Sequence, residues 1–281
     1  MRTAGPRPRR GETLDAFHHR RVLVLQKKRG YRFSVDAPLL ADFVRTRRTD
    51  EVLEMGTGSG IIALLLGRKP FRRLTALEVQ AGLAALAKRN VALNGLGDRV
   101  EVVRADYRTF RPKRKFDLVI SNPPYIPKAG GYVSRTSEKA IARHELRGGI
   151  GDLMRMTAEW LKPRGRACFV FSERRREDFL AAAGASGLRV RRWRSVRPRR
   201  GEPPNLFLAE LVLAGSAGRG EAGARGKRGA VTGTERSAAA PGGPGIEVKP
   251  PLILFKRAGE YTAEAEAIFS GRPPATSSGP S

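Results

Sequence analysis

Short apolar runs alternate with helix-like patterns through the middle of the chain. The runs are rich in Val, Leu, Ile and Phe, which is typical of buried strands, and the segments between them carry apolar residues at helical spacing. Strands that alternate with helices predict a parallel sheet covered by helices on both faces. The expected strands are 51–55, 73–78, 100–105, 116–121 and 166–172, and the expected helices are about 60–67, 80–94, 151–162 and 176–186.

Two more apolar stretches, 188–196 and 206–213, follow one another without a helix between them. The residues that join them are rich in Arg and Pro and are too few for a crossover helix. Strands joined in this way pair antiparallel. We therefore expect an α/β domain with a seven-stranded mixed sheet, whose C-terminal strands form an antiparallel hairpin.

Composition changes at both ends of this pattern. The N-terminal part carries a possible short strand at 22–26 and a helix at 37–44, with Asp36 placed as its N-cap and Pro38 in its first turn. A stretch of small, polar and basic residues separates a last apolar patch from the main domain, and this patch is too short to hold a core alone. The expected organisation is a basic N-terminal segment at 1–48, a main domain at 49–214, a flexible linker at 215–245, a small module at 246–270 that folds back on the domain, and a disordered tail at 271–281.

The charge of the chain is strongly unbalanced. Its 54 Lys and Arg against 27 Asp and Glu leave a net charge of +27. Such a surface attracts polyanions, so nucleic acid is the expected partner, although high-Arg codon usage in a GC-rich genome would explain part of the excess. The lone Cys168 lies among apolar residues, which indicates a buried hydrophobe and a reducing compartment. Because no run reaches the ~18 apolar residues of a membrane span and no secretory signal is present, we expect a cytoplasmic protein.

A glycine-rich loop follows the first strand of the main domain. Gly56, Gly58 and Gly60 permit positive φ and close approach of a ligand to the backbone, and Glu54 precedes them. Glu78 ends the next strand, where a carboxylate can accept hydrogen bonds from the ribose hydroxyls of an adenosine. Asp106 ends the third strand, at the same edge of the sheet, where it could reach the adenine amine.

The spacing of the glycines bears on which nucleotide is bound. The dinucleotide fingerprint is G-x-G-x-x-G, which places a pyrophosphate on a helix N-terminus. Here the spacing is G-x-G-x-G, and Glu54 would repel a pyrophosphate but suits the ammonium group of a methionine. S-adenosylmethionine therefore fits better than a nicotinamide cofactor.

The fourth strand ends in Asn122-Pro123-Pro124-Tyr125. The Asn side-chain oxygen and the Pro123 carbonyl can accept the two N–H bonds of a planar amine, and the prolines fix the backbone that aims them. Tyr125 can stack on a base. A plain strand-terminating turn is the alternative, but the glycine loop and Glu78 at the same edge favour the functional interpretation.

Together these residues resemble the class I S-adenosylmethionine-dependent methyltransferases that methylate amino or amide nitrogens, a Rossmann-like family. The Asn-Pro-Pro-Tyr motif resembles both N6-adenine methyltransferases and release-factor glutamine methyltransferases. Gly30 to Asp36 with Leu39-Leu40-Ala41, and Ala142 to Glu145, are similar to the bacterial family that methylates adenine-37 of a valine tRNA. The resemblance covers about residues 10–214, and it implies that Phe33, Ser34 and Asp36 help to close the cofactor pocket.

The chemistry implied by this resemblance needs no general base. Acceptors at Asn122 and Pro123 favour the positive charge that develops on the attacking nitrogen, which then loses its proton to water. His144-Glu145 would have a structural or RNA-facing role, although an acid–base pair is the other interpretation. His18 and His19 have no partners at ligand spacing, so we expect no metal site.

RNA would be held by two basic surfaces. Trp193 could stack on a base, and burial within the hairpin is the alternative. The linker at 219–236 is a weaker candidate for phosphate contact. The residues expected to bind RNA are Lys27, Lys28, Arg29 and Arg32 in the N-terminal segment, with Arg20 and Arg21 nearby, and Arg191, Arg192 and Arg194 in the C-terminal hairpin. These last three belong to a run from Arg189 to Arg200, and residues 188–201 hold seven arginines and no acidic residue.

Transfer of a methyl group to the N6 of an RNA adenine, most directly adenine-37 in a tRNA anticodon loop, is the predicted function. One alternative is a glutamine N5-methyltransferase that acts on release factors, which the short and basic N-terminal segment does not favour. Another is a noncatalytic RNA-binding module, which the intact cofactor and acceptor residues argue against.

Overall fold

A computed structural model describes residues 6–29, 32, 34–123, 149–215 and 245–271 of the chain. The predicted linker and C-terminal tail therefore lie almost entirely outside the described residues. So do Pro124, Tyr125, Phe33 and the pair His144-Glu145.

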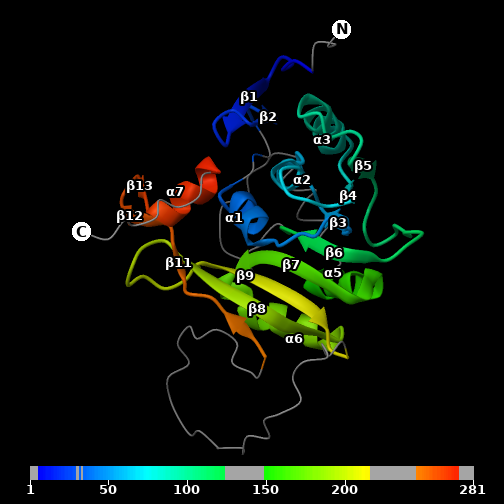
Figure 1. The fold of residues 1–281 in the computed structure, drawn as a ribbon, viewed down its shortest axis with the longest axis vertical. Coiled ribbons are helices and arrows are strands. Elements are labelled where there is room, and N and C mark those ends of the chain that lie inside the picture. Colours follow the sequence, from blue (N-terminus) through cyan, green and yellow to red (C-terminus); the bar gives the residue numbers. More distant parts are fainter. Residues whose placement is uncertain (1–5, 30–31, 33, 124–148, 216–244, 272–281) are drawn as a thin grey trace, which may run out of the picture.

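A mixed β-sheet forms the centre of the molecule (Figure 1). Its strands lie in the order β5-β4-β3-β6-β7-β9-β8, with the first five parallel and β9 antiparallel to both of its neighbours. The predicted fold class is thus confirmed. The strands are β3 (Glu51–Met55), β4 (Arg73–Glu78), β5 (Val100–Arg104), β6 (Phe116–Ser121), β7 (Leu161–Ser172), β8 (Leu188–Arg197) and β9 (Leu206–Leu213).

The sheet is larger than the expected seven strands. Two short strands, β10 (Glu247–Val248) and β11 (Leu252–Ile253), both pair with β8 in parallel and bring the total to nine. Two residues are too few to show any periodicity, so the sequence pattern missed these strands. They form because β8 would otherwise present unpaired backbone groups along its outer side.

Helices cover both faces of the sheet (Figure 1). Leu118 and Ile120 of β6 belong to the core on the side of α1, α2 and α3, whereas Val119 between them belongs to the core on the side of α5 and α6. This alternation follows from the two-residue repeat of a strand. The helices are α1 (Asp36–Phe43), α2 (Ile61–Leu66), α3 (Ala81–Leu93), α5 (Gly149–Trp160), α6 (Arg176–Ala185), which follows a 3₁₀ turn at Glu173–Arg175, and α7 (Ala263–Ser270).

A two-stranded hairpin, β1 (Glu12–Phe17) and β2 (Val22–Lys27), precedes α1. Asparagine amides on α3 fasten β2: Asn90 exchanges hydrogen bonds with the backbone of Leu25, at 2.7 and 3.0 Å, and Asn94 does the same with Leu23, at 2.9 and 2.7 Å. Each amide supplies one donor and one acceptor, as a neighbouring strand would. The sequence predicted β2 but not β1, because half-exposed residues give β1 no apolar pattern.

Basic side chains fix the C-terminal end of α1. Lys69 donates to the carbonyls of residues 41, 42 and 44 at 2.7–3.1 Å, and Arg192 and Arg166 donate to the carbonyls of residues 43 and 45 at 2.8 and 2.6 Å. These carbonyls have no partner within the helix, and cations at this end also suit the helix dipole. At the other end, Asp36 is the first helical residue rather than the expected N-cap. Val35 takes the cap position, without a side-chain bond.

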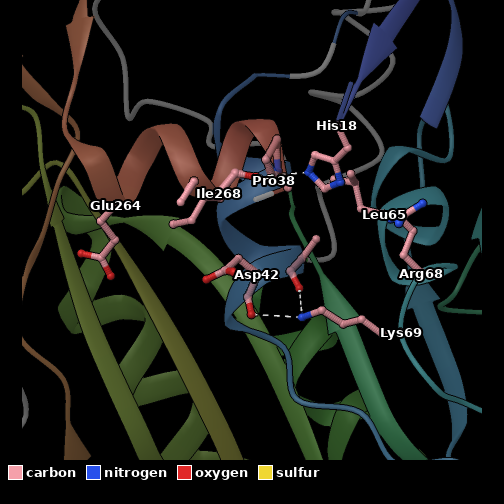
Figure 2. A pocket seen from close by; sticks show the side chains of 11 residues that line it. His18, Pro38, Asp42, Leu65, Arg68, Lys69, Glu264 and Ile268 are labelled. Carbon is pink, nitrogen blue, oxygen red and sulfur yellow. Dashed lines mark hydrogen bonds between the residues drawn. The ribbon is translucent and has the colours of Figure 1, made fainter. Parts of the chain in front are cut away.

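The C-terminal segment packs against the main domain. Leu252, Leu254 and Ala265 lie in its core, and the segment also holds a small hairpin of β12 (Phe255–Arg257) and β13 (Glu260–Tyr261). The imidazole of His18, in the turn of the first hairpin, hydrogen-bonds the carbonyl of Ile268 at 3.1 Å, as Figure 2 shows. The turn of the first hairpin and α7 thus meet beside α1.

Candidate active site at the carboxyl edge of the sheet

The glycine loop connects β3 to α2 at the carboxyl edge of the sheet. Gly56, Gly58 and Gly60 have φ angles of +74°, +59° and +89°, which disfavour other residues. A Cβ on Gly60 would also lie 3.3 Å from that of Ala87 on α3. The N–H groups of residues 56 and 57 donate to the carbonyl of Leu77, at 3.0 and 2.9 Å, and so tie the loop to the end of β4.

Glu78 holds this loop and the start of α3 together. One of its carboxylate oxygens accepts the Gly58 N–H at 2.8 Å, and the other accepts the Gln80 N–H at 2.9 Å. A carboxylate has about four lone-pair positions, so acceptor capacity remains for ribose hydroxyls. This is the position at which the sequence predicted ribose recognition.

Glu54 is buried beside the loop, with 1% of its surface exposed, and neither carboxylate oxygen forms a hydrogen bond of good geometry with a described residue. Burial raises its pKa to about 7, and the nearby Thr57 hydroxyl and Ala63 N–H oppose this shift only in part. The hydroxyls of Thr57 and Ser59 are likewise buried without such a hydrogen bond to a described residue. Buried polar groups without partners carry a free-energy penalty that a polar ligand would remove. A carboxylate in this state suits an ammonium group, so the site fits the methionine end of S-adenosylmethionine.

Asn90 is a functional candidate that sequence reasoning missed. Besides fastening β2, its amide donates to the carbonyl of Ser59 in the glycine loop at 2.8 Å, and the residue is fully buried. A polar residue in the middle of the amphipathic pattern of α3 was the available signal. Thr57 and Ser59 were also missed, because the spacing of the glycines says nothing about the residues that lie between them.

The carboxylate of Asp106 forms an ion pair with the nearby side chain of Arg108. Arg108 donates to both of its carboxylate oxygens, at 2.5–3.0 Å, and these hydrogen bonds lower the pKa of Asp106 despite partial burial. Asp106 is therefore ionised and oriented. The expected adenine contact stays a prediction, and it would have to share the carboxylate with Arg108.

Asn122 follows β6 directly and is half-buried, and Pro123 after it is buried. Ser121 pairs with Met55 in register, and its hydroxyl donates to the Met55 carbonyl at 2.9 Å, so Asn122 emerges next to Gly56. Neighbouring strands lie about 4.8 Å apart. The structure thus places the first half of the Asn-Pro-Pro-Tyr motif beside the glycine loop.

The C-terminal hairpin presents only part of the basic surface that we expected: Arg199 and Arg200 are exposed in its loop, but two arginines of β8 are enclosed. Arg192 is 1% exposed and Arg194 is 9% exposed, and they pair with Glu210 at 2.7 Å and Glu264 at 2.6 Å. Trp193 is fully buried and stacked on Phe207, with ring centroids 4.1 Å apart. The expectation that Arg192 and Arg194 face RNA is therefore wrong, and Trp193 follows the buried alternative.

The cause is what packs over this face of β8. Phe43 at the end of α1 lies over the guanidinium of Arg192, and Pro250 and Glu264 of the C-terminal segment contact Arg194, so both arginines are enclosed and need acidic partners. Arg191 keeps a more exposed guanidinium, although it also pairs with Glu210. Cys168, which contacts this cluster, is buried, and burial raises the pKa of its thiol to about 12, so it is inert as expected.

The N-terminal basic residues lie closer to the site. The Nζ of Lys27 is 3.7 Å from the position of a Cβ on Gly82, in the first turn of α3 and near Glu78. Lys28 and Arg29 follow on the surface. Arg32 is half-exposed, and its guanidinium pairs with Asp15 at 2.7 Å. RNA binding by these four residues stays a prediction.

A pocket of about 350 Å³ lies elsewhere, between the first hairpin, α1, α2 and α7. His18, Asp42, Lys69 and Glu264 are among its lining residues, and Figure 2 shows Lys69 directed at the C-terminal end of α1. No residue predicted for catalysis or cofactor binding lines it. It is therefore separate from the carboxyl-edge site.

Within the described part of the chain, no three His, Cys, Asp or Glu side chains gather in a way that could hold a metal ion. The described helices also include none that is long and apolar enough to cross a membrane.

The chain is similar to known methyltransferases. Residues 32–175 match the family described as the methyltransferase small domain. Curated relatives named tRNA1(Val) (adenine(37)-N6)-methyltransferase include one from a Flavobacteriaceae bacterium, 35% identical over 56% of this chain and 66% of that protein, and one from Vibrio campbellii, 31% identical over 65% of this chain and 76% of that protein. A solved structure of a predicted O-methyltransferase from Agrobacterium tumefaciens superposes with a TM-score of 0.57, at 20% identity, over 84% of this chain and 96% of that one.

The fold and the carboxyl-edge site define a Rossmann-like methyltransferase. The chain belongs to the methyltransferase small domain family, which confirms the resemblance seen in the sequence. It is an enzyme, and its methyl donor is S-adenosylmethionine.

Proposed function

We propose that this enzyme methylates the exocyclic N6 of an adenine in tRNA, and that its target is adenine-37 in the anticodon loop of a valine tRNA. The relatives that carry this activity in their names support the proposal. The structural observation that supports it is the position of Asn122, half-buried beside the glycine loop at the end of β6. A tRNA substrate also agrees with the net charge of +27, and it implies a cytoplasmic location.

The chain's own residues have distinct roles in this proposal. S-adenosylmethionine, when bound, supplies a methyl group on a sulfonium that needs little activation. Glu54 holds the ammonium group of the donor and Glu78 holds its ribose. Asn122 and the Pro123 carbonyl accept hydrogen bonds from the adenine amine and stabilise the positive charge that develops on N6. The proton then leaves to water, so no side chain acts as a general base.

The remaining assignments follow the sequence and rest on the resemblance. Tyr125 stacks on the flipped base, and Pro124 stiffens the platform. Asp106 contacts the adenine of the donor, and Phe33 and Asp36 close the pocket. The proposed RNA contacts are Lys27, Lys28, Arg29, Arg32 and Arg191.

A release-factor glutamine methyltransferase would share the Asn-Pro-Pro-Tyr motif. The relatives whose names give a tRNA adenine as the target, together with the net charge of +27, support RNA rather than a protein as the substrate.

The test is to incubate the protein with labelled S-adenosylmethionine and, separately, tRNA, rRNA, DNA or a release factor. We expect label in tRNA, recovered as N6-methyladenosine at the anticodon loop after nuclease digestion. Label on the release factor alone would overturn the RNA substrate. Label on no substrate would favour a noncatalytic RNA-binding module.

A further inference from the structure

The loops at the amino edge of the sheet, opposite the active site, are strongly basic. The register pairs Glu51 with Arg73, Leu74 with Val100, Val52 with Leu118, and Leu118 with Arg166. The starts of the five parallel strands therefore lie along one line. The segments that lead into or begin these strands contain fourteen Lys and Arg and four Asp and Glu. We call them the amino-edge segments: 45–51, 68–73, 98–99, 113–117 and 162–166.

Most of the acidic residues at this edge already form ion pairs with basic residues of the same edge. Asp50 pairs with Arg166 at 2.5 Å in the interior, Glu51 pairs with Arg72 and Arg114, and Asp117 pairs with Lys162 at 2.7 Å. Several basic side chains at this edge remain without an acidic partner among the described residues. The side chains of Arg47, Arg48, Arg73, Lys113, Lys115 and Arg164 are exposed, and none of them forms an ion pair with another described residue.

The strand-end segments at the carboxyl edge of the same sheet are nearly balanced, although Lys27, Lys28 and Arg29 of the N-terminal segment add positive charge beside this edge. The described strand-end segments hold seven Lys and Arg and six Asp and Glu. Codon usage would enrich Arg on both edges alike, so it does not account for the difference. The segments counted are 56–60, 78–80, 105–108, 122–123, 173–178 and 197–205.

We infer that the amino edge binds the phosphate backbone of the substrate tRNA at a distance from the target adenine; this rests on the proposed function. Unpaired surface cations of one sign repel each other, and a polyanion relieves that repulsion. Five adjacent strands make a row about 19 Å wide, and a strand of five residues separates the two edges by about 17 Å. An RNA stem that continues from an anticodon loop is long enough to follow the side of the domain from one edge to the other.

The experiment compares full-length tRNA with a short anticodon stem–loop. The variant is the triple Arg47→Gln, Arg73→Gln, Lys115→Gln, which removes three exposed cations from three amino-edge segments. The matched control is Arg10→Gln, Lys88→Gln, Arg257→Gln, which removes the same charge from exposed positions outside both edges of the sheet. For each protein, affinity for both RNAs is measured across a series of salt concentrations, and methyl transfer into the stem–loop is measured alongside.

In the variant, we expect the slope of log affinity against log salt for full-length tRNA to decrease in magnitude by about 2–3, with a loss of about tenfold or more at low salt. Stem–loop affinity and methylation should stay near wild type, which shows that the fold and site are intact. An unchanged slope, or an equal loss in the control triple, would overturn the inference. If wild type methylates neither RNA, the proposed function itself fails, and that outcome is recognised without reference to the variants.

Discussion

The two edges of the central sheet use charge in opposite ways. At the carboxyl edge, Glu54, Thr57 and Ser59 are buried polar groups without a hydrogen bond of good geometry to a described residue, enclosed around the glycine loop. At the amino edge, acidic groups are paired and the surplus cations face solvent. Buried groups act strongly over a few ångströms, whereas exposed charges act weakly but over about a Debye length. The first arrangement suits a small ligand held for chemistry, and the second suits a large polyanion.

The arginines of the chain show the same contrast within one residue type. Arg166 and Arg192 are enclosed with Asp50 and Glu210, and both also donate to carbonyls at the end of α1. Arg164, two residues from Arg166, is exposed and forms no ion pair with the described residues. Total charge alone therefore overstates the surface available to RNA.

The largest effect on stability should come from an enclosed arginine. Arg166→Met leaves Asp50 as an uncompensated buried charge and frees the Arg45 carbonyl, so we expect a loss of about 3–5 kcal/mol in the free energy of unfolding. Arg164→Met should change it by less than about 0.5 kcal/mol. Urea denaturation of both variants measures this difference. Equal losses would mean that enclosure does not separate the two kinds of arginine.

The next largest effect tests the chemistry of the carboxyl edge. Asn122→Ala removes an acceptor for the developing charge on N6, and we expect kcat to fall about 10²–10³-fold, by analogy with the loss of one group that stabilises a transition-state charge. Affinity for S-adenosylmethionine should be nearly unchanged. Single-turnover methylation and calorimetric titration measure the two quantities.

Glu78→Ala is the matched control for Asn122→Ala. It should weaken binding of S-adenosylmethionine first, because Glu78 contacts the glycine loop and the proposed ribose position. If Asn122→Ala instead lost cofactor affinity and kept normal turnover, the assigned role of Asn122 would be wrong.

The residues at the carboxyl edge could be predicted because the strands that carry them are recognisable from short local sequence patterns. Parallel strands are short apolar runs, and their ends bring Gly56, Glu78, Asp106 and Asn122 to one edge by topology alone. The burial of Arg192 depends on Phe43, Glu210 and the C-terminal segment, which are distant in sequence. The local sequence of an arginine run is the same whether or not a later segment of the chain buries it, so burial could not be predicted from that run. The amino-edge surface was missed for a related reason: its charges come from five separate loops.

A smaller effect should distinguish the two asparagines of α3. Asn90→Leu and Asn94→Leu each remove bonds to β2 and should cost about 1–3 kcal/mol in stability. Only Asn90 also holds the Ser59 carbonyl in the glycine loop. We therefore expect Asn90→Leu to weaken S-adenosylmethionine binding severalfold and Asn94→Leu to leave it unchanged. Calorimetry on both folded variants measures this, and equal affinities would remove Asn90 from the cofactor site.

The smallest effect concerns pH and Glu54. Because burial raises the pKa of Glu54 to about 7, the free protein takes up a proton there as the pH falls through neutrality. The ammonium group of the donor needs the ionised carboxylate, so affinity should be present above this pKa and lost below it. With a pKa near 7, S-adenosylmethionine should bind about threefold to fourfold more weakly at pH 6 than at pH 8, because its own α-amino group begins to lose its proton near pH 8 and offsets part of the effect.

Glu54→Gln should bind S-adenosylmethionine weakly at both pH values, since an amide cannot compensate the ammonium charge. Glu51→Gln changes a carboxylate of the same strand at the amino edge and should keep the wild-type dependence on pH. Titration calorimetry of the three proteins at pH 6 and pH 8 separates these outcomes. A wild-type affinity that is constant between the two pH values would mean that Glu54 does not face the ammonium group. Binding of the donor at the carboxyl edge would then depend on Glu78 and the glycine loop alone.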